Sequence, residues 1–258
     1  MKFTLKRFFP KISSWLSKKY NFWKNKIYYQ KTFLDFSDQY IKTSRFDHTI
    51  FRSIVKNPKL GDDTINTPFD RHYIYHTAWA ARKLYKSKPS IHQDIGSHLF
   101  FVTLVSAFIH IKHYDFRPPE IDLDNFGSKH EDLTNLSFND NSISSLSCMH
   151  VIEHIGLGRY GDTIDPDGDL NAIDELIRVL AKNGNLYFVV PIGIPRIYFN
   201  AHRIYDPVWL VNYFKHKGLI IEEFAVIPDR GHLLRYQSPS DFCNQDYACG
   251  CYSIIKKE

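Results

Sequence analysis

Residues 147–169, SCMHVIEHIGLGRYGDTIDPDGD, carry more ionisable side chains than a turn between two elements requires. His150 and His154 could each take up a proton near neutral pH, because an imidazole has an ordinary pKa of about 6.5. Glu153 could orient one of these rings, and Arg159 could bind a phosphate or carboxylate group. The stretch therefore predicts a site for proton transfer on a polar substrate.

Two further acids lie at the ends of predicted strands. Asp94 is followed by Gly96 and Ser97, and a small residue there lets backbone amides approach a ligand. Asp115 ends the next strand roughly 20 residues later, where a carboxylate can accept both hydrogen bonds of a ribose diol. Each acid alone is explained equally well by a strand that turns or ends at the surface. Together they indicate a nucleoside site.

The elements that must position these residues alternate between strands and helices. Their ranges are strands at 90–97, 109–116, 143–152, 185–193, 219–227 and 247–257, and helices at 70–87, 98–108, 169–184 and 206–218. This alternation predicts an α/β fold with a mostly parallel central sheet flanked by helices. Ligands of such sheets bind beyond the carboxyl ends of the strands, where the polar clusters lie.

Capping residues predict where several helices begin and end. Asp70 and Asp206 are expected as N-caps, and Pro207 suits the first turn of its helix. Gly184 and Gly218 are expected to stop the helices before them.

Charge is distributed unevenly along the chain. Residues 1–31 contain nine Lys or Arg and no acid, whereas the remaining 24 basic residues are outnumbered by 28 Asp and Glu. Aromatic residues interleaved with lysines suit an amphipathic segment on an anionic membrane. The alternative is a solvated helix that docks its aromatic face on the rest of the protein. The excess of positive charge is confined to one end, so no nucleic-acid partner is expected.

Length and composition predict a basic, mostly helical N-terminal extension over 1–67 and one α/β domain over 68–258. The 43% hydrophobic content is sufficient for a packed core and argues against wholesale disorder. The sequence shows four cysteines, no secretory signal and no apolar run of about 18 residues. A cytoplasmic location is therefore expected, at the inner face of the membrane if the extension binds there.

Long strings within the domain resemble known proteins. HEDLTNLSFNDNSISSLSCMHVIEHI and AIDELIRVLAKNGNLYFVVP resemble the conserved pattern of class I S-adenosylmethionine-dependent methyltransferases. SLSCMHVIEHIGLGRYGD, with FDRHYIYHTAWAARKL before it and FNAHRIYDP after it, resembles an uncharacterised methyltransferase-like family first catalogued from Caenorhabditis proteins and also found in bacteria. The resemblance covers about residues 68–227. It implies a Rossmann-like class I methyltransferase fold and S-adenosylmethionine as the cofactor.

The resemblance also implies roles for individual residues. Asp94, Gly96 and Ser97 would face the methionine part of the cofactor, and Asp115 would hold the ribose. Asp132 and Leu133 would border the adenine, with His150 near the cofactor.

A hydroxyl acceptor requires a base as the methyl group is transferred. His154 is the first candidate, Glu153 would orient it, and His202 is a second candidate. The side chains expected to contact a small-molecule or glycan acceptor are Arg159, Tyr160, Asp162, Asn200 and Arg203. The expected reaction is O-methylation of a sugar or glycan precursor, because lipid-linked glycan assembly would also explain the basic extension.

One motif departs from the methyltransferase pattern. In DIGSHLFF, the residues Ser97, His98 and Leu99 stand where small residues are usual, and His98 is expected to crowd the cofactor. This favours an alternative in which the protein has lost methyl transfer and binds a sugar or nucleotide ligand or acts as an assembly partner.

No metal ligands are predicted from the sequence. HVIEH has the order His-x-x-Glu-His, which would bind zinc only on a helix, and a strand end is expected there. Cys243, Cys249 and Cys251 form no pair of CxxC units, so they are interpreted as small buried hydrophobic residues.

Overall fold

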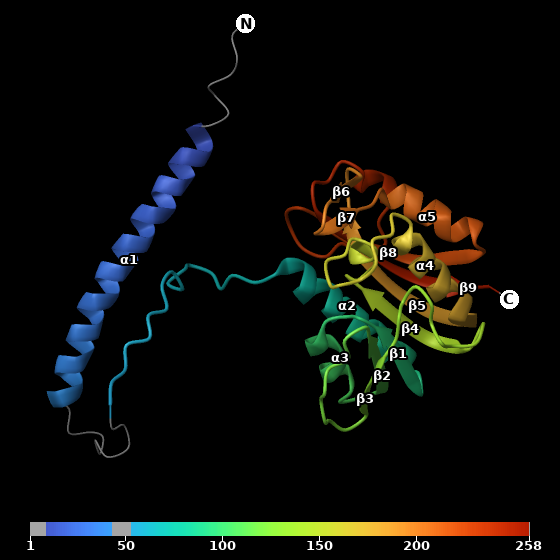
Figure 1. The fold of residues 1–258 in the computed structure, drawn as a ribbon, viewed down its shortest axis with the longest axis horizontal. Coiled ribbons are helices and arrows are strands. Elements are labelled where there is room, and N and C mark those ends of the chain that lie inside the picture. The colour runs from blue at the N-terminus through green and yellow to red at the C-terminus, as the bar shows by residue number, and fades with distance from the viewer. Residues whose placement is uncertain (1–8, 43–52, 258) are drawn as a thin grey trace, which may run out of the picture. The chain divides into compact units, whose positions relative to one another are not determined.

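The computed structural model describes residues 9–42 and 53–257, and the chain divides into two units, residues 1–68 and 69–258 (Figure 1). In the first unit, α1 (Phe9–Lys42) is a single helix of 34 residues, and residues 53–68 contain no helix or strand. Large apolar side chains of α1 are exposed, namely Tyr20, Phe22, Trp23, Ile27, Tyr28, Leu34 and Phe36. In the described part of the chain, no helix has both the length and the apolar character needed to cross a bilayer.

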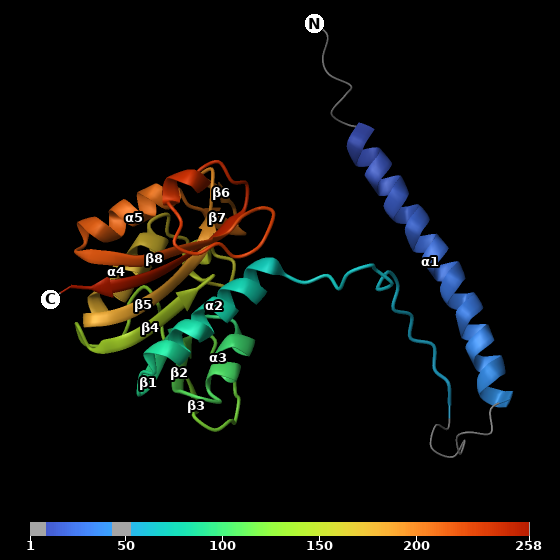
Figure 2. The ribbon, with the colours of Figure 1, turned by 180° about the vertical axis from the view of Figure 1, so that it is seen from behind.

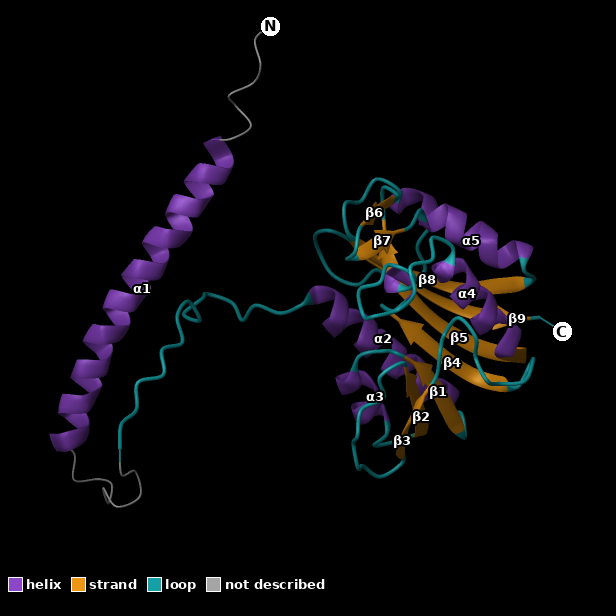
Figure 3. Ribbon diagram, in the orientation of Figure 1, coloured by secondary structure: helices purple, strands orange, loops and turns teal. Residues whose placement is uncertain are grey.

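The second unit is built on a seven-stranded sheet with the order β3-β2-β1-β4-β5-β9-β8 (Figure 3). Its strands are β1 (Ile91–Ile95), β2 (His110–Asp115), β3 (Phe126–His130), β4 (Ile143–Met149), β5 (Leu180–Ile192), β8 (Leu219–Ile227) and β9 (Ala248–Lys256). Strands β3, β2, β1, β4 and β5 pair in parallel, whereas β9 runs antiparallel between β5 and β8. The prediction of a mostly parallel sheet is confirmed.

Helices cover both faces of this sheet, as the views from the front and the back show (Figures 1 and 2). Buried residues of α2 (Arg71–Ser87) and α3 (Leu99–Val105) belong to one apolar cluster. Those of α4 (Gly168–Val179) and α5 (Pro207–His216) belong to the other. The smaller elements are a hairpin of β6 (Arg196–Tyr198) and β7 (His202–Ile204) and the 3-10 turns η2 (Ile152–His154) and η3 (Pro239–Phe242).

Both predicted N-caps are present. The carboxylate of Asp70 accepts a hydrogen bond from the backbone N–H of Tyr73 at 3.1 Å. One oxygen of Asp206 accepts from the backbone N–H groups of Val208 and Trp209 at 2.8 and 2.9 Å. These bonds satisfy amides that the first turn of a helix leaves without a partner.

Three sequence expectations about elements were wrong. Helix α4 ends at Val179 instead of Gly184, because Leu180 already pairs with Ile143 of β4 and residues 181–184 bulge out of β5. Helix α3 ends at Val105 instead of residue 108, and its side chains Phe100 and Leu104 are more than 70% exposed to solvent. Strand β3 and the β6–β7 hairpin were missed, since short strands with mixed polarity give no clear period.

Helix α2 is fastened to the sheet by one buried carboxylate. Glu223 of β8 accepts from Lys83 at 2.6 Å, from Arg235 at 2.6 and 2.7 Å, and from the indole of Trp79 at 3.3 Å. Burial by itself would raise the pKa of Glu223, but the bonds from Arg235 and Lys83 outweigh it and lower the pKa to about 2. Lys83 and Trp79 lie on α2, so this contact fixes the helix against the sheet.

We expect Glu223→Gln to lower the free energy of unfolding near neutral pH by about 1.5–3 kcal/mol, the value of a hydrogen bond to a charged group. The folded-state pKa lies below the ordinary 4.5, so this contribution is present above that pH and is lost as the pH falls toward 2. Urea unfolding across this pH range should show that the difference in free energy of unfolding between the wild-type chain and Glu223→Gln becomes smaller as the pH falls. Glu222→Gln, at the exposed neighbouring position, is the control. A difference independent of pH would contradict the assignment.

Candidate functional site

The site lies where the strand order reverses. Strand β1 pairs with β2 on one side and with β4 on the other, so the carboxyl ends of the three strands meet at one edge of the sheet. A cavity of about 520 Å³ opens there. Its walls include several of the residues predicted from the sequence, namely Gly96, Asp115, Asp132, Leu133, His150, His154, Tyr160 and Asp162.

Gly96 brings bare backbone to the cavity wall. Its φ of +68° is in the left-handed region, and its N–H donates to the carbonyl of Tyr114 at 2.8 Å. A Cβ at this position would lie 3.1 Å from both methyl groups of Val151. A side chain at this position would be disfavoured by the conformation and would press on Val151.

The expected crowding by His98 does not occur in the cavity wall. Its imidazole is exposed, accepts a hydrogen bond from the N–H of Phe100 at 3.3 Å and lies 5.1 Å from the ring of Tyr73. It is not among the residues that line the cavity.

Asp115 offers a carboxylate to the cavity. Oδ1 accepts from the backbone N–H of Arg117 at 2.7 Å, and Oδ2 makes no hydrogen bond in the described part of the chain. The side chain is half-buried and the apolar residues Tyr114 and Ile95 lie beside it in the wall. This arrangement can accept hydrogen bonds from a ligand hydroxyl.

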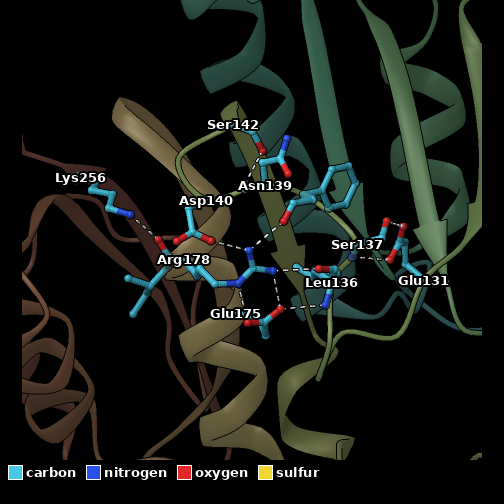
Figure 4. A network of polar contacts seen from close by, with 11 residues as sticks. Glu131, Leu136, Ser137, Asn139, Asp140, Ser142, Glu175, Arg178 and Lys256 are labelled. Carbon is cyan, nitrogen blue, oxygen red and sulfur yellow. Dashed lines mark hydrogen bonds and ion pairs between the residues drawn. The ribbon is translucent and has the colours of Figure 1, made fainter.

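The loop that carries Asp132 and Leu133 is held by an arginine of α4 (Figure 4). The guanidinium of Arg178 donates to the carbonyls of Leu136 and Phe138, each at 2.8 Å. It also donates to Asp140 at 2.7 Å. These bonds fix the loop between β3 and β4 against α4.

A second carboxylate completes this contact. Glu175, one turn before Arg178, receives two hydrogen bonds from the guanidinium at 2.7 Å and one from the N–H of Leu136 at 2.8 Å. At the other side of the loop, Glu131 accepts from the backbone and the hydroxyl of Ser137 (Figure 4). Leu133 is thereby held buried in the cavity wall.

The loop after β4 folds back on itself around Asp162. The N–H groups of Gly156 and Gly158 donate to its Oδ2 at 2.9 and 3.1 Å, and that of Tyr160 donates to Oδ1 at 3.1 Å. Burial would raise the pKa of Asp162, but these bonds outweigh it and lower the pKa. A Cβ on Gly156 would lie 2.0 Å from the carbonyl oxygen of Asp165, so the turn requires glycine. Asp162 lines the cavity, yet its carboxylate holds the loop, which argues against its predicted role toward an acceptor.

Two imidazoles of this loop share one carboxylate. His150 Nδ1 lies 2.7 Å from Glu153 Oε1, and His154 Nε2 lies 3.8 Å from the same oxygen. His154 Nδ1 lies 2.6 Å from the carbonyl of Ala201, which can only accept, so this nitrogen carries a proton. In the neutral ring, the lone pair that a base requires is therefore on His154 Nε2. Glu153 is buried and contacts both rings without lining the cavity.

Asp94 and Ser97, which were predicted to face the methionine part of the cofactor, do not line the cavity. The carboxylate of Asp94 is fully buried and accepts from His113 Nδ1 at 2.9 Å, from the N–H of Ser97 at 3.1 Å and from the hydroxyl of Ser147. Burial opposes both charges, but this pairing lowers the pKa of Asp94 and raises that of His113. The pair joins β1 to β2 inside the sheet.

The β6–β7 hairpin supports the loop after β4 through Arg203 of β7. Arg203 is buried, donates to the carbonyls of Ile155 and Pro166 at 2.6 and 3.3 Å, and lies 3.4 Å from Asp169. Arg203 was predicted to contact the acceptor; it does not line the cavity, and its donors hold the loop after β4. Asn200 is exposed and does not line the cavity.

Two more residues predicted at the site, His202 and Arg159, do not line the cavity. His202 does not line the cavity; its ring lies 5.0 Å from that of Tyr247, and burial lowers its pKa. Arg159 is exposed, donates to the carbonyl of Ala201 at 3.1 Å and lies over the ring of Tyr160 at 5.1 Å.

Sequence reasoning missed the residues that α2 brings to this edge. His72 stacks between two rings, 5.6 Å from His150 and 4.9 Å from Tyr247. Burial, and then the nearby His150, lower the pKa of His72 to about 4. Tyr73 and His76 lie within 5.4 and 5.0 Å of the same His150 ring. The sequence predicted only a helix over 70–87 and gave these side chains no role at the site.

A comparison with protein families gives one match. Residues 102–222 match the model of a family described as Caenorhabditis protein of unknown function, DUF268. The matched range includes Asp115, Asp132 and the loop after β4. No curated protein sequence matches the chain significantly.

Solved structures identify the fold. The Burkholderia thailandensis 1,6-didemethyltoxoflavin-N1-methyltransferase, solved with S-adenosylhomocysteine, is 12% identical with a TM-score of 0.51 and coverage of 71% of this chain and 79% of that one. The [4+2]-cyclase SpnF is also 12% identical with a TM-score of 0.51, and the match covers 70% of this chain and 80% of that one. A third match is a Haloferax volcanii complex of the Trm112 methyltransferase activator with a methyltransferase-type partner. It is 16% identical with a TM-score of 0.50, and the match covers 73% of this chain and 90% of that one. The second unit therefore has the Rossmann-like class I methyltransferase fold.

Proposed function

We propose that the second unit binds S-adenosylmethionine in the cavity and transfers its methyl group to a hydroxyl of a sugar or glycan precursor. The observation that carries this proposal is the convergence of chain segments far apart in sequence on one cavity. Gly96, Asp115, Leu133 and His154 follow different strands or lie in different loops, yet all line the same 520 Å³ space. That volume and its mixed apolar and acidic wall suit a nucleoside.

The residues of the cavity fit this cofactor. The backbone at Gly96 can approach the methionine portion closely, because glycine has no side chain. The free oxygen of Asp115 can accept from the ribose hydroxyls, and buried Leu133 offers an apolar surface to the adenine. When bound, S-adenosylmethionine supplies an electrophilic methyl group.

The protein's own groups would supply positioning and a base. His154 Nε2 would take the proton of the acceptor hydroxyl as that oxygen attacks. The bond from His154 Nδ1 to Ala201 fixes the ring in the tautomer that leaves Nε2 free. Glu153, within 3.8 Å of Nε2, would stabilise the imidazolium that forms.

The rival function is ligand binding without methyl transfer, in which the protein holds a sugar or nucleotide or acts as an assembly partner. Ser97, whose hydroxyl accepts from the N–H of Met149 at 3.2 Å, fills a position that is usually small, and this observation favours the rival. Fold alone does not decide between the two functions.

Calorimetry with S-adenosylhomocysteine tests cofactor binding. The chain should bind it, and Asp115→Ala should weaken binding by about 1–3 kcal/mol, or roughly 5- to 150-fold, through lost charged hydrogen bonds. Asp122→Ala, on the exposed loop after β2, is the matched control and should leave the affinity unchanged. No heat at millimolar ligand would support the rival function, and equal affinity in both variants would remove Asp115 from the site.

The assignment of His154 is tested by separating binding from turnover. Mass spectrometry of sugar nucleotides incubated with the chain and S-adenosylmethionine should reveal a methylated acceptor. With that acceptor, His154→Gln should slow turnover by about 10²- to 10⁴-fold while leaving the affinity for S-adenosylhomocysteine within about twofold. His216→Gln, on the exposed end of α5, should change neither. Unchanged turnover in His154→Gln would show that another group is the base.

We also propose that residues 1–31 place the protein on anionic membranes. The described part of this segment belongs to α1 and exposes Tyr20, Trp23 and Tyr28 among lysines. Aromatic rings suit the headgroup region, and each lysine near an anionic surface adds about 1 kcal/mol of attraction. Lipid-linked glycan precursors are found at such a surface.

Liposome sedimentation tests this contact. The full chain should pellet with vesicles that contain anionic phospholipid and should remain in solution with neutral vesicles. A chain lacking residues 1–31 should remain in solution with both. Equal pelleting of the two chains would rule out membrane binding through this segment.

A further inference from the structure

Three side chains from different elements meet beside the cavity and form what is called here the imidazole–thiol cluster. His72 lies in the first turn of α2, His150 follows β4 and Cys249 lies on β9. Each offers one ligand atom, and these atoms all lie within 4.8 Å of one another. The cluster includes none of the residues assigned above to the nucleoside except His150, which also lines the cavity.

The hydrogen bond from His150 to Glu153 orients the ring so that its other nitrogen, Nε2, faces the thiol of Cys249. Its Nδ1 lies 2.7 Å from Glu153 Oε1, and a carboxylate can only accept, so Nδ1 carries the proton. Nε2 therefore has a lone pair, and Cys249 Sγ lies 3.4 Å from it. A histidine that gives one nitrogen to a carboxylate and offers the other is the usual arrangement of a metal ligand.

The spacing suits a tetrahedral ion. Bond lengths of about 2.3 Å to sulfur and 2.0–2.1 Å to nitrogen place those two atoms about 3.5 Å apart in a tetrahedral site, close to the 3.4 Å between Cys249 and His150. The rings of His72 and His150 lie nearly parallel, 5.6 Å apart with an angle of 13° between their planes.

The surroundings are dry and contain polar atoms without partners. Cys249 is fully buried and His150 is 8% exposed. Glu153 Oε2 and His76 Nε2 are buried, and each has no hydrogen-bond partner in the described part of the chain. The His76 ring lies 5.0 Å from that of His150. Buried polar atoms normally have partners, so this concentration indicates that a polar or charged group belongs there.

The backbone brings the ligands together under constraint. His150 has a φ of +58°, a left-handed conformation that side chains seldom adopt and that is concentrated at functional sites. The start of α2 is held by Arg71, whose guanidinium donates to the carbonyls of Asp229 and Pro228 at 3.0 and 3.2 Å. His72 is consequently fixed in place relative to the sheet.

We propose that His72, His150 and Cys249 bind one divalent ion of the zinc class, with a fourth coordination position left open. The two imidazoles and a thiolate are the ligands that zinc prefers, and three protein ligands with an open position are typical of catalytic zinc. The thiol proton leaves to solvent as the Cys249–metal bond forms, and no oxidation is involved.

The open position gives the ion a role that rests on the proposed function. Of the three ligands, only His150 lines the cavity, and an open position directed toward the cavity would let the ion coordinate the acceptor hydroxyl. Coordination lowers the pKa of that hydroxyl and orients its oxygen. His154, which shares Glu153 with His150, then takes the proton.

Cobalt binding to the full chain tests the site without any turnover. Addition of Co²⁺ alone should give the intense near-ultraviolet absorption of thiolate–cobalt charge transfer and the strong visible bands of four-coordinate cobalt, saturating at one equivalent. Zn²⁺ should displace the cobalt and abolish both features. Absence of the charge-transfer band in the wild-type chain would overturn the proposal.

Variants identify the ligands. Cys249→Ser should remove the charge-transfer band, whereas Cys243→Ser, at a half-buried thiol that contacts the carbonyl of Pro239, should retain it. His72→Phe keeps a ring in the stack but removes the nitrogen, so it should weaken Zn²⁺ binding at least tenfold in a chain that still folds by circular dichroism. Glu153→Gln should weaken it about 10- to 100-fold. An unchanged band in Cys249→Ser, or unchanged zinc affinity in folded His72→Phe, would refute the ligand set.

The same samples separate this proposal from the function on which its role depends. A cobalt spectrum with thiolate ligation but no heat with S-adenosylhomocysteine would support the metal site and refute cofactor binding. Heat with S-adenosylhomocysteine but no thiolate–cobalt band would refute the metal site alone.

Discussion

Strand β1 pairs in parallel with β2 and with β4, and both sites proposed in the second unit depend on that arrangement. Parallel pairing on both sides brings three carboxyl ends to one edge, and the change of direction in strand order leaves a space between the loops that follow. Gly96, Asp115 and His154 reach that space from positions up to about sixty residues apart in the sequence. The antiparallel β9 then brings Cys249 to the same edge, beside His150.

Burial divides the polar residues at this edge into two kinds. A charge removed from water must be paired, so Asp94 is bound by His113 and two serines, and Arg203 is bound by carbonyls and Asp169. These groups are engaged in holding the strands and the loop after β4. Asp115 keeps a free oxygen, as His154 keeps a free nitrogen, and such groups can act on a ligand.

The sequence predicted the alternating elements well because apolar periodicity and capping residues act locally, as at Asp70 and Asp206. It also placed eight residues of the cavity wall, among them Gly96, Asp115 and His154, since residues at strand ends share one edge. It could not show that Asp94 and Arg203 are paired, because their partners are 19 and 34 or more residues away. Nor could it show His72 beside Cys249, a contact between the first helix and the last strand of the domain.

A crystal structure of the full chain with S-adenosylhomocysteine would test the central claim most directly. The account predicts density for the nucleoside at the ends of β1, β2 and β4, with the ribose hydroxyls on the carboxylate of Asp115 and the adenine against Leu133. A ligand bound elsewhere on the protein, or a cavity closed by side chains in crystals grown at saturating ligand, would contradict it.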